Sequence, residues 1–239
     1  MIVLRAVNDV RAACAPSFRA SLTGSRPRLG RLVLRAPLCS AKRIIGLYGG
    51  SFDPPHGGHV HVAQMAQTYL GLDEVWWLVS PQNPLKPQVG SLSERISAIG
   101  QLLAHRSTRM RIVNFEARAR LQFTADTVCA LQRRFSGVHF VLILGADSFA
   151  NMHLWRRWRE IVATLPIAVI ARPGQTFRAL RSPAAQYAHQ ARVPSHAALR
   201  LGTKPPPAWL YLPTAYVALS STLLRASAAQ AQTSMDLSA

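Results

Sequence analysis

The feature that most restricts the fold is an alternation of short apolar runs with helix-compatible stretches, beginning near residue 42. The apolar runs are typical of buried strands and occupy residues 43–48, 74–79, 110–115, 138–144, 167–170 and 209–212. Helices are expected over 58–70, 91–104, 124–135 and 147–162, and from residue 221 onward. Strands that alternate with helices of this length indicate βαβ units. We therefore expect one α/β domain over residues 42–228, with a Rossmann-like, doubly wound, mainly parallel sheet and helices on both faces.

The segments outside this alternation have a different composition. Residues 1–40 hold seven arginines, no lysine and one acidic residue, so 1–41 is expected to be an extra leader, either a transit peptide or an extension from an upstream start. Residues 229–239 form a short tail. Between 172 and 208 the chain has six prolines and no acidic residue, which indicates a substrate-side flap or a partly disordered insertion.

The charge balance points to anionic partners. The chain has 28 Lys and Arg against 10 Asp and Glu, a formal charge of +18. A nucleic-acid-binding module is one alternative, although no basic helix or aromatic-basic strand motif appears. No apolar run approaches the ~20 residues of a membrane span. The three cysteines have no metal-type spacing and do not indicate a disulfide framework, so we expect a cytoplasmic protein. From the missing motifs and the short apolar runs, we expect no nucleic-acid partner and no membrane partner. A homo-oligomer is compatible with the sequence.

The segment GGSFDPPHGGH, residues 49–59, directly follows the first expected strand. Ligands of open parallel sheets bind at the carboxyl ends of the strands, where this loop should lie. Its glycines let backbone amides approach a phosphate, and the helix beginning near Gly58 points its positive end there. The chain has neither a GxxxxGK[ST] loop nor a GxGxxG fingerprint. The segment therefore predicts a nucleotide site of another kind.

Three histidines, His56, His59 and His61, lie close together in this segment. A zinc site is one interpretation, but only His56 and His59 could converge, and no Cys, Asp or Glu stands at a familiar spacing. The other interpretation is that both imidazoles donate hydrogen bonds to phosphate oxygens.

The loop resembles the HxGH signature of the nucleotidylyltransferase superfamily, in the long form of nicotinate-nucleotide adenylyltransferases. Further segments similar to that family follow in its order: SPQNPLK at 80–86, FTADT at 123–127, GADS at 145–148 with Trp155, RPG at 172–174 and SSTLLR at 220–225. The resemblance spans residues 44–226. It implies adenylyl transfer from ATP to nicotinic acid mononucleotide, giving the dinucleotide and pyrophosphate in NAD biosynthesis.

The same resemblance implies the residues of each half of the site. The expected catalytic residues are His56, His59 and Arg225. The expected ATP contacts are Gly49, Gly50, Ser51, Phe52, His56, His59, Gly145, Asp147, Ser221, Thr222 and Arg225. The expected acceptor contacts are Asn83, Lys86, Thr124, Trp155 and Arg172.

Several of these residues have a purely structural alternative. Asp147 and the Ser220–Thr222 segment could be ordinary helix N-caps, and Lys86 could be a solvated side chain. Trp155 could belong to the core. ATP chemistry implies Mg²⁺ as cofactor, but the sequence indicates no residue as its ligand, so we expect no metal-binding residues (metal: none).

The chain departs from the family at three points. The leader is additional, Phe123 stands where a tyrosine is common, and the tail after Arg225 is shorter than in many relatives. An adenylyltransferase for another acceptor, nicotinamide mononucleotide or phosphopantetheine, remains the alternative within the superfamily.

Overall fold

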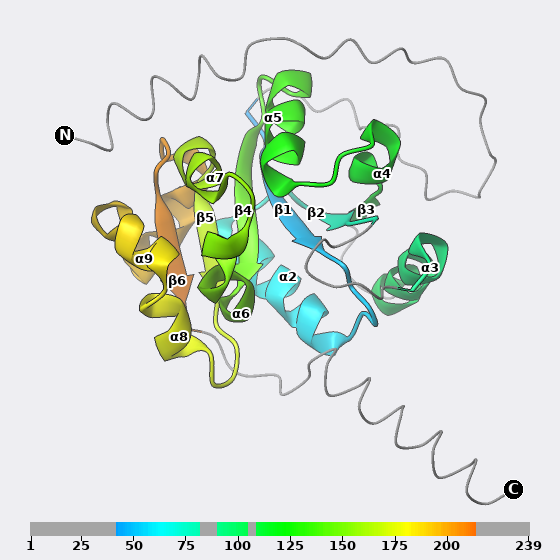
Figure 1. The fold of residues 1–239 in the computed structure, drawn as a ribbon, viewed down its shortest axis with the longest axis horizontal. Helices are drawn as coiled ribbons and strands as arrows, with labels where there is room; N and C mark the ends of the chain where they lie inside the picture. Colours follow the sequence, from blue (N-terminus) through cyan, green and yellow to red (C-terminus); the bar gives the residue numbers. More distant parts are fainter. Residues whose placement is uncertain (1–41, 82–89, 105–108, 214–239) are drawn as a thin grey trace, which may run out of the picture.

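The computed structural model of the chain describes residues 42–81, 90–104 and 109–213. The strands of this part form one sheet of six strands in the order β3-β2-β1-β4-β5-β6, and each neighbouring pair is parallel. Helices pack on both sides of the sheet (Figure 1). The doubly wound α/β architecture is confirmed, and its strand order reverses between β1 and β4, where such sheets bind ligands.

The strands follow the predicted apolar runs closely. Three strands have the predicted bounds: β2 (Glu74–Val79), β5 (Ile167–Ile170) and β6 (Trp209–Leu212). The others differ at their ends by one or two residues: β1 (Ile44–Gly50), β3 (Met110–Val113) and β4 (His139–Gly145). Most strand residues are buried, as expected of parallel strands that are covered on both faces.

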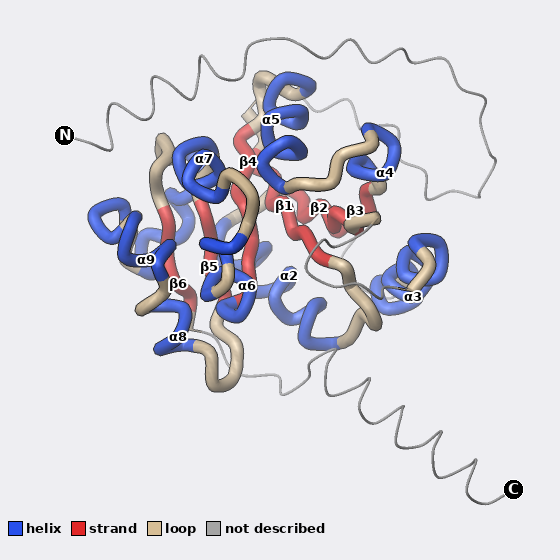
Figure 2. The backbone as a smooth tube through the Cα atoms, in the orientation of Figure 1, coloured by secondary structure: helices blue, strands red, loops and turns tan. Residues whose placement is uncertain are grey.

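The core has two layers because side chains alternate along each strand. In β1, Ile45 and Leu47 belong to one buried cluster and Tyr48 to the other. The first face is covered by α5 (Thr124–Arg134), α6 (Ala146–Ala150), α7 (Trp158–Thr164), α8 (Thr176–Leu180) and α9 (Pro183–Tyr187). The second is covered by α2 (Gly57–Leu70), α3 (Leu92–Leu103) and the 3₁₀ segment η3 (Ser195–Thr203) (Figure 2). The remaining short elements are α4 (Phe115–Ala119), η1 (Met152–Leu154) and η2 (His189–Ala191).

Helix α3 confirms its predicted start. The Ser91 hydroxyl accepts a hydrogen bond from the Glu94 amide at 3.3 Å, as expected of an N-cap. Helix α5 begins at its predicted first residue, Thr124, and Phe123 occupies the N-cap position without a side-chain hydrogen bond.

The single helix expected over 147–162 is wrong, because the chain is divided there into α6, η1 and α7. The side-chain amide of Asn151 donates to the Asp147 carbonyl at 3.0 Å, a local bond that competes with the helical ladder. Trp155 has extended backbone and Arg157 has a left-handed φ of 57°, so neither continues a helix. Asp147 lies in the first turn of α6 and is not its cap, which is Gly145.

The segment from 172 to 208 is an ordered crossover from β5 to β6, so the partly disordered alternative is wrong. It forms α8, α9, η2 and η3, and Leu201 of η3 is fully buried against the second face. A Cβ built on Gly202 would overlap the Ile44 side chain, so glycine allows η3 to approach β1 closely. Short helices with small buried residues carry this crossover in place of one long amphipathic helix.

Other expectations about the chain ends and the cysteines have mixed outcomes. The leader 1–41, the helix expected from residue 221 and the tail 229–239 lie outside the described residues. Two of the three cysteines, Cys14 and Cys39, also lie there, so the expectation drawn from the cysteines stays a prediction. No helix in the described ranges is both long enough and apolar enough to cross a membrane.

Candidate active site at the carboxyl edge of the sheet

The loop that follows β1 is held in place by an aromatic anchor. Phe52 has a left-handed φ of 48°, and its ring is 2% exposed. The ring packs against Tyr48 and Trp77, with centroids 5.3 and 4.9 Å away. Because the ring is committed to the core, only the backbone of Phe52 can face a nucleotide. Gly49, in contrast, has no atom within 4 Å of a built Cβ, so its backbone is open to a ligand.

His56 and His59 cap helix α2 reciprocally. Nδ1 of His56 accepts from the Gly58 amide at 3.1 Å, and Nδ1 of His59 accepts from the His56 amide at 3.2 Å. These two bonds assign the proton of each neutral ring to Nε2. The centroids of the two rings are 3.8 Å apart, so the two Nε2–H groups lie close together beside the N-terminus of α2.

The His56 ring is neutral at physiological pH. Burial lowers the pKa of His56 to about 4, and the positive charge of Arg172 acts in the same direction. Nε2 of His56 is buried and has no hydrogen-bond partner among the described residues. A buried donor without a partner is the arrangement expected where a ligand supplies the acceptor.

The end of β4 brings a carboxylate to the same edge, because β4 pairs directly with β1. Oδ1 of Asp147 lies 3.5 Å from Nε of Arg172, and a Cβ on Gly145 would come within 2.5 Å of that oxygen. A larger residue at 145 would require the ends of the Asp147 and Arg172 side chains to shift. The Asp147 side chain is 47% exposed, and its Oδ1 has no hydrogen-bond partner in the described part of the chain. The carboxylate can thus accept hydrogen bonds from the hydroxyl groups of a sugar.

Arg172 connects the two strand ends electrostatically. Its side chain, which follows β5, is 14% exposed and lies next to Asp147 and Tyr48. Burial raises the pKa of the Tyr48 hydroxyl, while Arg172 opposes that rise. The structure therefore places Arg172, an expected acceptor contact, beside Asp147, an expected ATP contact.

The other predicted residues are divided between described and undescribed parts. Thr124 begins α5, and Trp155 is partly buried against the first core cluster after η1. Phe123 lies under the guanidinium of Arg156, 4.6 Å from the ring centroid. Asn83 and Lys86 of the loop after β2, and Ser221, Thr222 and Arg225 near the end of the chain, lie outside the described residues.

Two buried polar residues of this edge escaped the sequence analysis. Arg95 in α3 is 3% exposed and donates hydrogen bonds to the loops that follow β1 and β2. Glu116 in α4 is 8% exposed and accepts from the Thr127 hydroxyl at 2.9 Å. A signal existed for Arg95, because it is four residues before Ile99 on the buried side of α3. No comparable pattern marks Glu116.

The described residues contain no group of three or more His, Cys, Asp or Glu side chains that could hold a metal ion. His61 is on the same helix as the reciprocal pair but does not share in its capping bonds.

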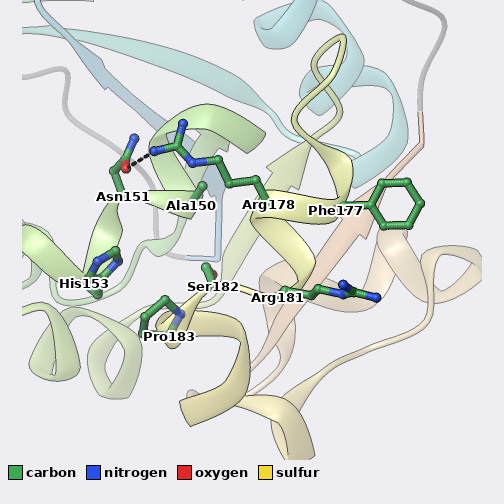
Figure 3. Close-up of a pocket in the computed structure, with 8 residues that line it drawn as sticks. All are labelled: Ala150, Asn151, His153, Phe177, Arg178, Arg181, Ser182 and Pro183. Carbon is green, nitrogen blue, oxygen red and sulfur yellow. Dashed lines mark hydrogen bonds between the residues drawn. The ribbon is translucent and has the colours of Figure 1, made fainter.

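A separate cavity of about 380 Å³ lies between the α6–η1 region and the α8–α9 region (Figure 3). Arg178 points toward Asn151 there and donates to its Oδ1 at 3.1 Å. The cavity contains none of the predicted site residues; it is lined by Ala150, Asn151, His153, Phe177, Arg178, Arg181, Ser182 and Pro183. The candidate active site at the carboxyl ends of β1 and β4 is therefore separate from this cavity.

Comparison with known sequences gives a consistent family. The cytidylyltransferase-like family model matches residues 47–227. A Cereibacter sphaeroides protein named "Probable nicotinate-nucleotide adenylyltransferase" is 47% identical over 184 residues, which cover 77% of this chain and 96% of that protein. A Methylorubrum extorquens protein of the same name is 47% identical over 183 residues, covering 76% of this chain and 98% of its own length.

Comparison with solved structures agrees on the fold. A Plasmodium falciparum nicotinic acid mononucleotide adenylyltransferase complexed with NaAD superimposes with a TM-score of 0.58 at 15% identity, over 77% of this chain and 82% of that one. The same enzyme complexed with APC gives a TM-score of 0.56. With the histidine pair at the strand switch point and the sequence relatives in agreement, the chain belongs to the cytidylyltransferase-like family, among the nicotinate-nucleotide adenylyltransferases.

Proposed function

We propose that this protein transfers the adenylyl group of ATP to nicotinic acid mononucleotide, forming nicotinic acid adenine dinucleotide and pyrophosphate. The observation that carries the proposal is the pair of Nε2–H donors of His56 and His59, held at the N-terminus of α2 beside Asp147. Relatives that are 47% identical to this chain are named for that activity.

The chemistry needs positioning and charge stabilisation more than a nucleophile from the protein. The acceptor phosphate is itself anionic, so one of its oxygens attacks the α-phosphorus of ATP directly. His56 and His59 donate to the phosphate oxygens around that phosphorus, where negative charge builds in the transition state. The backbone from Gly49 to Phe52 lies against the phosphates, and Asp147 accepts from the ribose hydroxyls. Ser221, Thr222 and Arg225 are proposed contacts of the β- and γ-phosphates.

The acceptor nucleotide is proposed to lie against Trp155, whose indole would stack on the pyridine ring. Thr124 adds a hydroxyl and a helix N-terminus on the same side. Asn83, Lys86 and Arg172 are the proposed polar contacts, and the two cations suit the acceptor's phosphate. Arg172 lies within 3.5 Å of Asp147, so it would stand between the two substrates.

Mg²⁺ is proposed to enter with ATP. The described residues offer no cluster of carboxylates or imidazoles that would fit a resident metal ion, so no step of the transfer is assigned to a protein-bound one. We place the enzyme in the cytoplasm as part of the same proposal, and a homo-oligomer remains compatible with it.

The test is a comparison of acceptors with the full chain. The protein with ATP and Mg²⁺ is given nicotinic acid mononucleotide, nicotinamide mononucleotide or phosphopantetheine, and pyrophosphate release is measured. We expect the nicotinate nucleotide to have the highest kcat/KM. A preference for phosphopantetheine, or release that does not depend on an acceptor, would contradict the proposal.

A further inference from the structure

Arg95 is a buried arginine whose hydrogen bonds all go to backbone carbonyl groups. It is 3% exposed and belongs to α3. Nη1 donates to Ser51 O at 2.6 Å and to Ser80 O at 2.9 Å, Nη2 donates to Pro81 O at 3.2 Å, and Nε donates to Gly90 O at 2.9 Å.

The four carbonyls come from the two loops that the proposed reaction must align. Ser51 is in the loop after β1, which carries the proposed ATP contacts. Ser80 and Pro81 begin the loop after β2, and Gly90 ends it; between them in the sequence stand Asn83 and Lys86, the proposed acceptor contacts. One nitrogen, Nη1, bonds to both loops at once.

Other bonds join the same loops at the same point. The Ser80 amide donates to Gly50 O at 3.0 Å, and the Gly90 amide donates to Oδ2 of Asp53 at 3.3 Å. Glu116 extends the network from Ser80: its carboxyl group is hydrogen-bonded to the Ser80 side chain and accepts from the hydroxyl of Thr127 in α5 at 2.9 Å. Helix α5 begins with Thr124. Arg95 is thus the charged centre of a polar network that runs from the ATP loop to the acceptor side.

The stability of the fold does not by itself explain a buried arginine at this position. Burying a guanidinium is unfavourable, and burial lowers the pKa of Arg95, with Asp53 opposing the change. In the described part of the chain, no carboxylate lies within ion-pair distance of it. What the arginine provides is geometry: a planar fork that holds carbonyls in several directions, which a lysine ammonium on a flexible stem cannot reproduce.

We propose that Arg95 is a positioning residue that sets the distance and angle between the ATP loop and the acceptor loop. In the transfer, which is the proposed function on which this inference rests, an acceptor phosphate oxygen forms a bond to the α-phosphorus. The bond from that phosphorus to the bridging oxygen breaks, and its electron pair leaves with pyrophosphate. In-line attack is sensitive to displacements on the order of 1 Å. Arg95 touches neither substrate and acts through the two loops.

The test compares Arg95→Lys and Arg95→Ala with the wild-type full chain. Each substrate is first titrated alone, and the kcat of the complete reaction is then measured. Because each loop still binds its own substrate, we expect single-substrate dissociation constants to change by about threefold or less, while kcat falls about 10²-fold. Adding guanidinium chloride at about 20 mM, far below denaturing concentrations, should restore part of the kcat of Arg95→Ala.

The matched control is Arg111→Ala in β3, which removes an arginine that pairs with Glu74 at 2.8 Å, away from both loops. This variant should lose stability but keep kcat, and guanidinium should not affect it. Three results would overturn the assignment: a kcat loss explained fully by weaker binding of the single substrates, the absence of guanidinium rescue, or failure of both Arg95 variants to fold. If the wild type turns over a different acceptor, the proposed function fails, and the same measurements are made with that acceptor.

Discussion

At the amino edge of the sheet, Glu74 uses both of its oxygens, whereas at the carboxyl edge several buried polar atoms have no hydrogen-bond partner in the described residues. Oε1 of Glu74 lies 3.0 Å from Arg43 and 2.8 Å from Arg111, and Oε2 accepts from Trp76 Nε1 at 2.9 Å. At the other edge, His56 Nε2 has no hydrogen-bond partner among the described residues, and neither do Asp147 Oδ1 and Arg172 Nε, which form an ion pair with each other at 3.5 Å. The amino edge also leaves Arg111 Nε without a hydrogen bond, but both oxygens of its carboxylate are used, whereas at the carboxyl edge a donor of His56 and an acceptor of Asp147 remain open. Because buried polar groups are normally satisfied, we infer that the carboxyl edge is the binding site. Substitutions at the two edges should therefore affect different quantities.

The largest effect is expected from His59→Ala at the carboxyl edge. Removing a donor that acts on the charged transition state should lower kcat by a factor on the order of 10² to 10⁴, while stability falls only by the loss of one capping bond, about 0.5–2 kcal/mol. The control is His61→Ala on the same helix, which should keep its turnover. Wild-type turnover in His59→Ala would show that the histidine pair is not the reacting centre.

At the amino edge, Glu74→Ala should have the opposite signature. Loss of this buried carboxylate removes an ion-pair partner from Arg43 and Arg111 and the acceptor of the Trp76 indole N–H, and we expect the free energy of unfolding to fall by about 2–3 kcal/mol, with unchanged kcat. Its neighbours lower the pKa of Glu74 against the effect of burial, so the stabilisation is present above pH 4.5 and is lost as pH falls. Urea unfolding measures the change. Glu160→Ala, which breaks an exposed pair with Arg157, should stay within about 1 kcal/mol of wild type; an equal loss in both variants would contradict the comparison.

Trp155→Ala tests the acceptor side of the carboxyl edge. If the indole stacks on the pyridine ring, KM for nicotinic acid mononucleotide should rise about ten- to a hundredfold, corresponding to about 1–3 kcal/mol, and KM for ATP should change little. If Trp155 serves only the core, the variant should instead lose about 3–5 kcal/mol of stability, and both KM values should move together. Trp158→Ala is the matched control, because Trp158 packs against the same core cluster and also contacts Tyr187.

Glu116 permits a smaller test that depends on pH. Burial raises the pKa of Glu116 from 4.5 to about 6, although the Thr127 hydroxyl opposes the shift. The native state therefore holds a proton that the unfolded chain releases between these values, so this group lowers stability by about 2 kcal/mol as pH rises through the window. The free energy of unfolding is measured with urea at several pH values for wild type and Glu116→Gln. The difference between the two proteins should isolate the pH dependence that Glu116 contributes.

His56 acts in the reverse sense in the same experiment. Its pKa is lowered from 6.5 to about 4, so its contribution to stability is lost as pH falls through that window. Because it is present in both Glu116 proteins, it cancels from their difference. Thr127→Val should enlarge the Glu116 slope, since it removes the hydroxyl that lowers the pKa of Glu116. A flat difference between wild type and Glu116→Gln would show that the carboxyl group is solvated.

Much of the fold could be predicted because buried parallel strands produce continuous apolar runs. Residues 74–79, 167–170 and 209–212 became strands with the predicted bounds. The helix over 147–162 was wrong because its breaks depend on the Asn151 side-chain bond and on backbone angles at Trp155 and Arg157 that have no local periodic signal. The same holds for the candidate site. The spacing of His56 and His59 predicted that the two rings converge, but no pattern in the sequence predicted the hydrogen bonds of Arg95.

By itself, the sequence of this protein determined the α/β class, the strand positions and the glycine- and histidine-rich loop that follows the first strand, because each of these depends on residues that are neighbours in the chain. Only the tertiary structure decided that β1 and β4 lie side by side, that Asp147 meets Arg172 across Gly145, and that Arg95 bonds to carbonyls 44 and 15 residues away. The physical reason is that backbone carbonyls are the same in every residue. A side chain that binds them leaves no complementary partner to be found in the sequence.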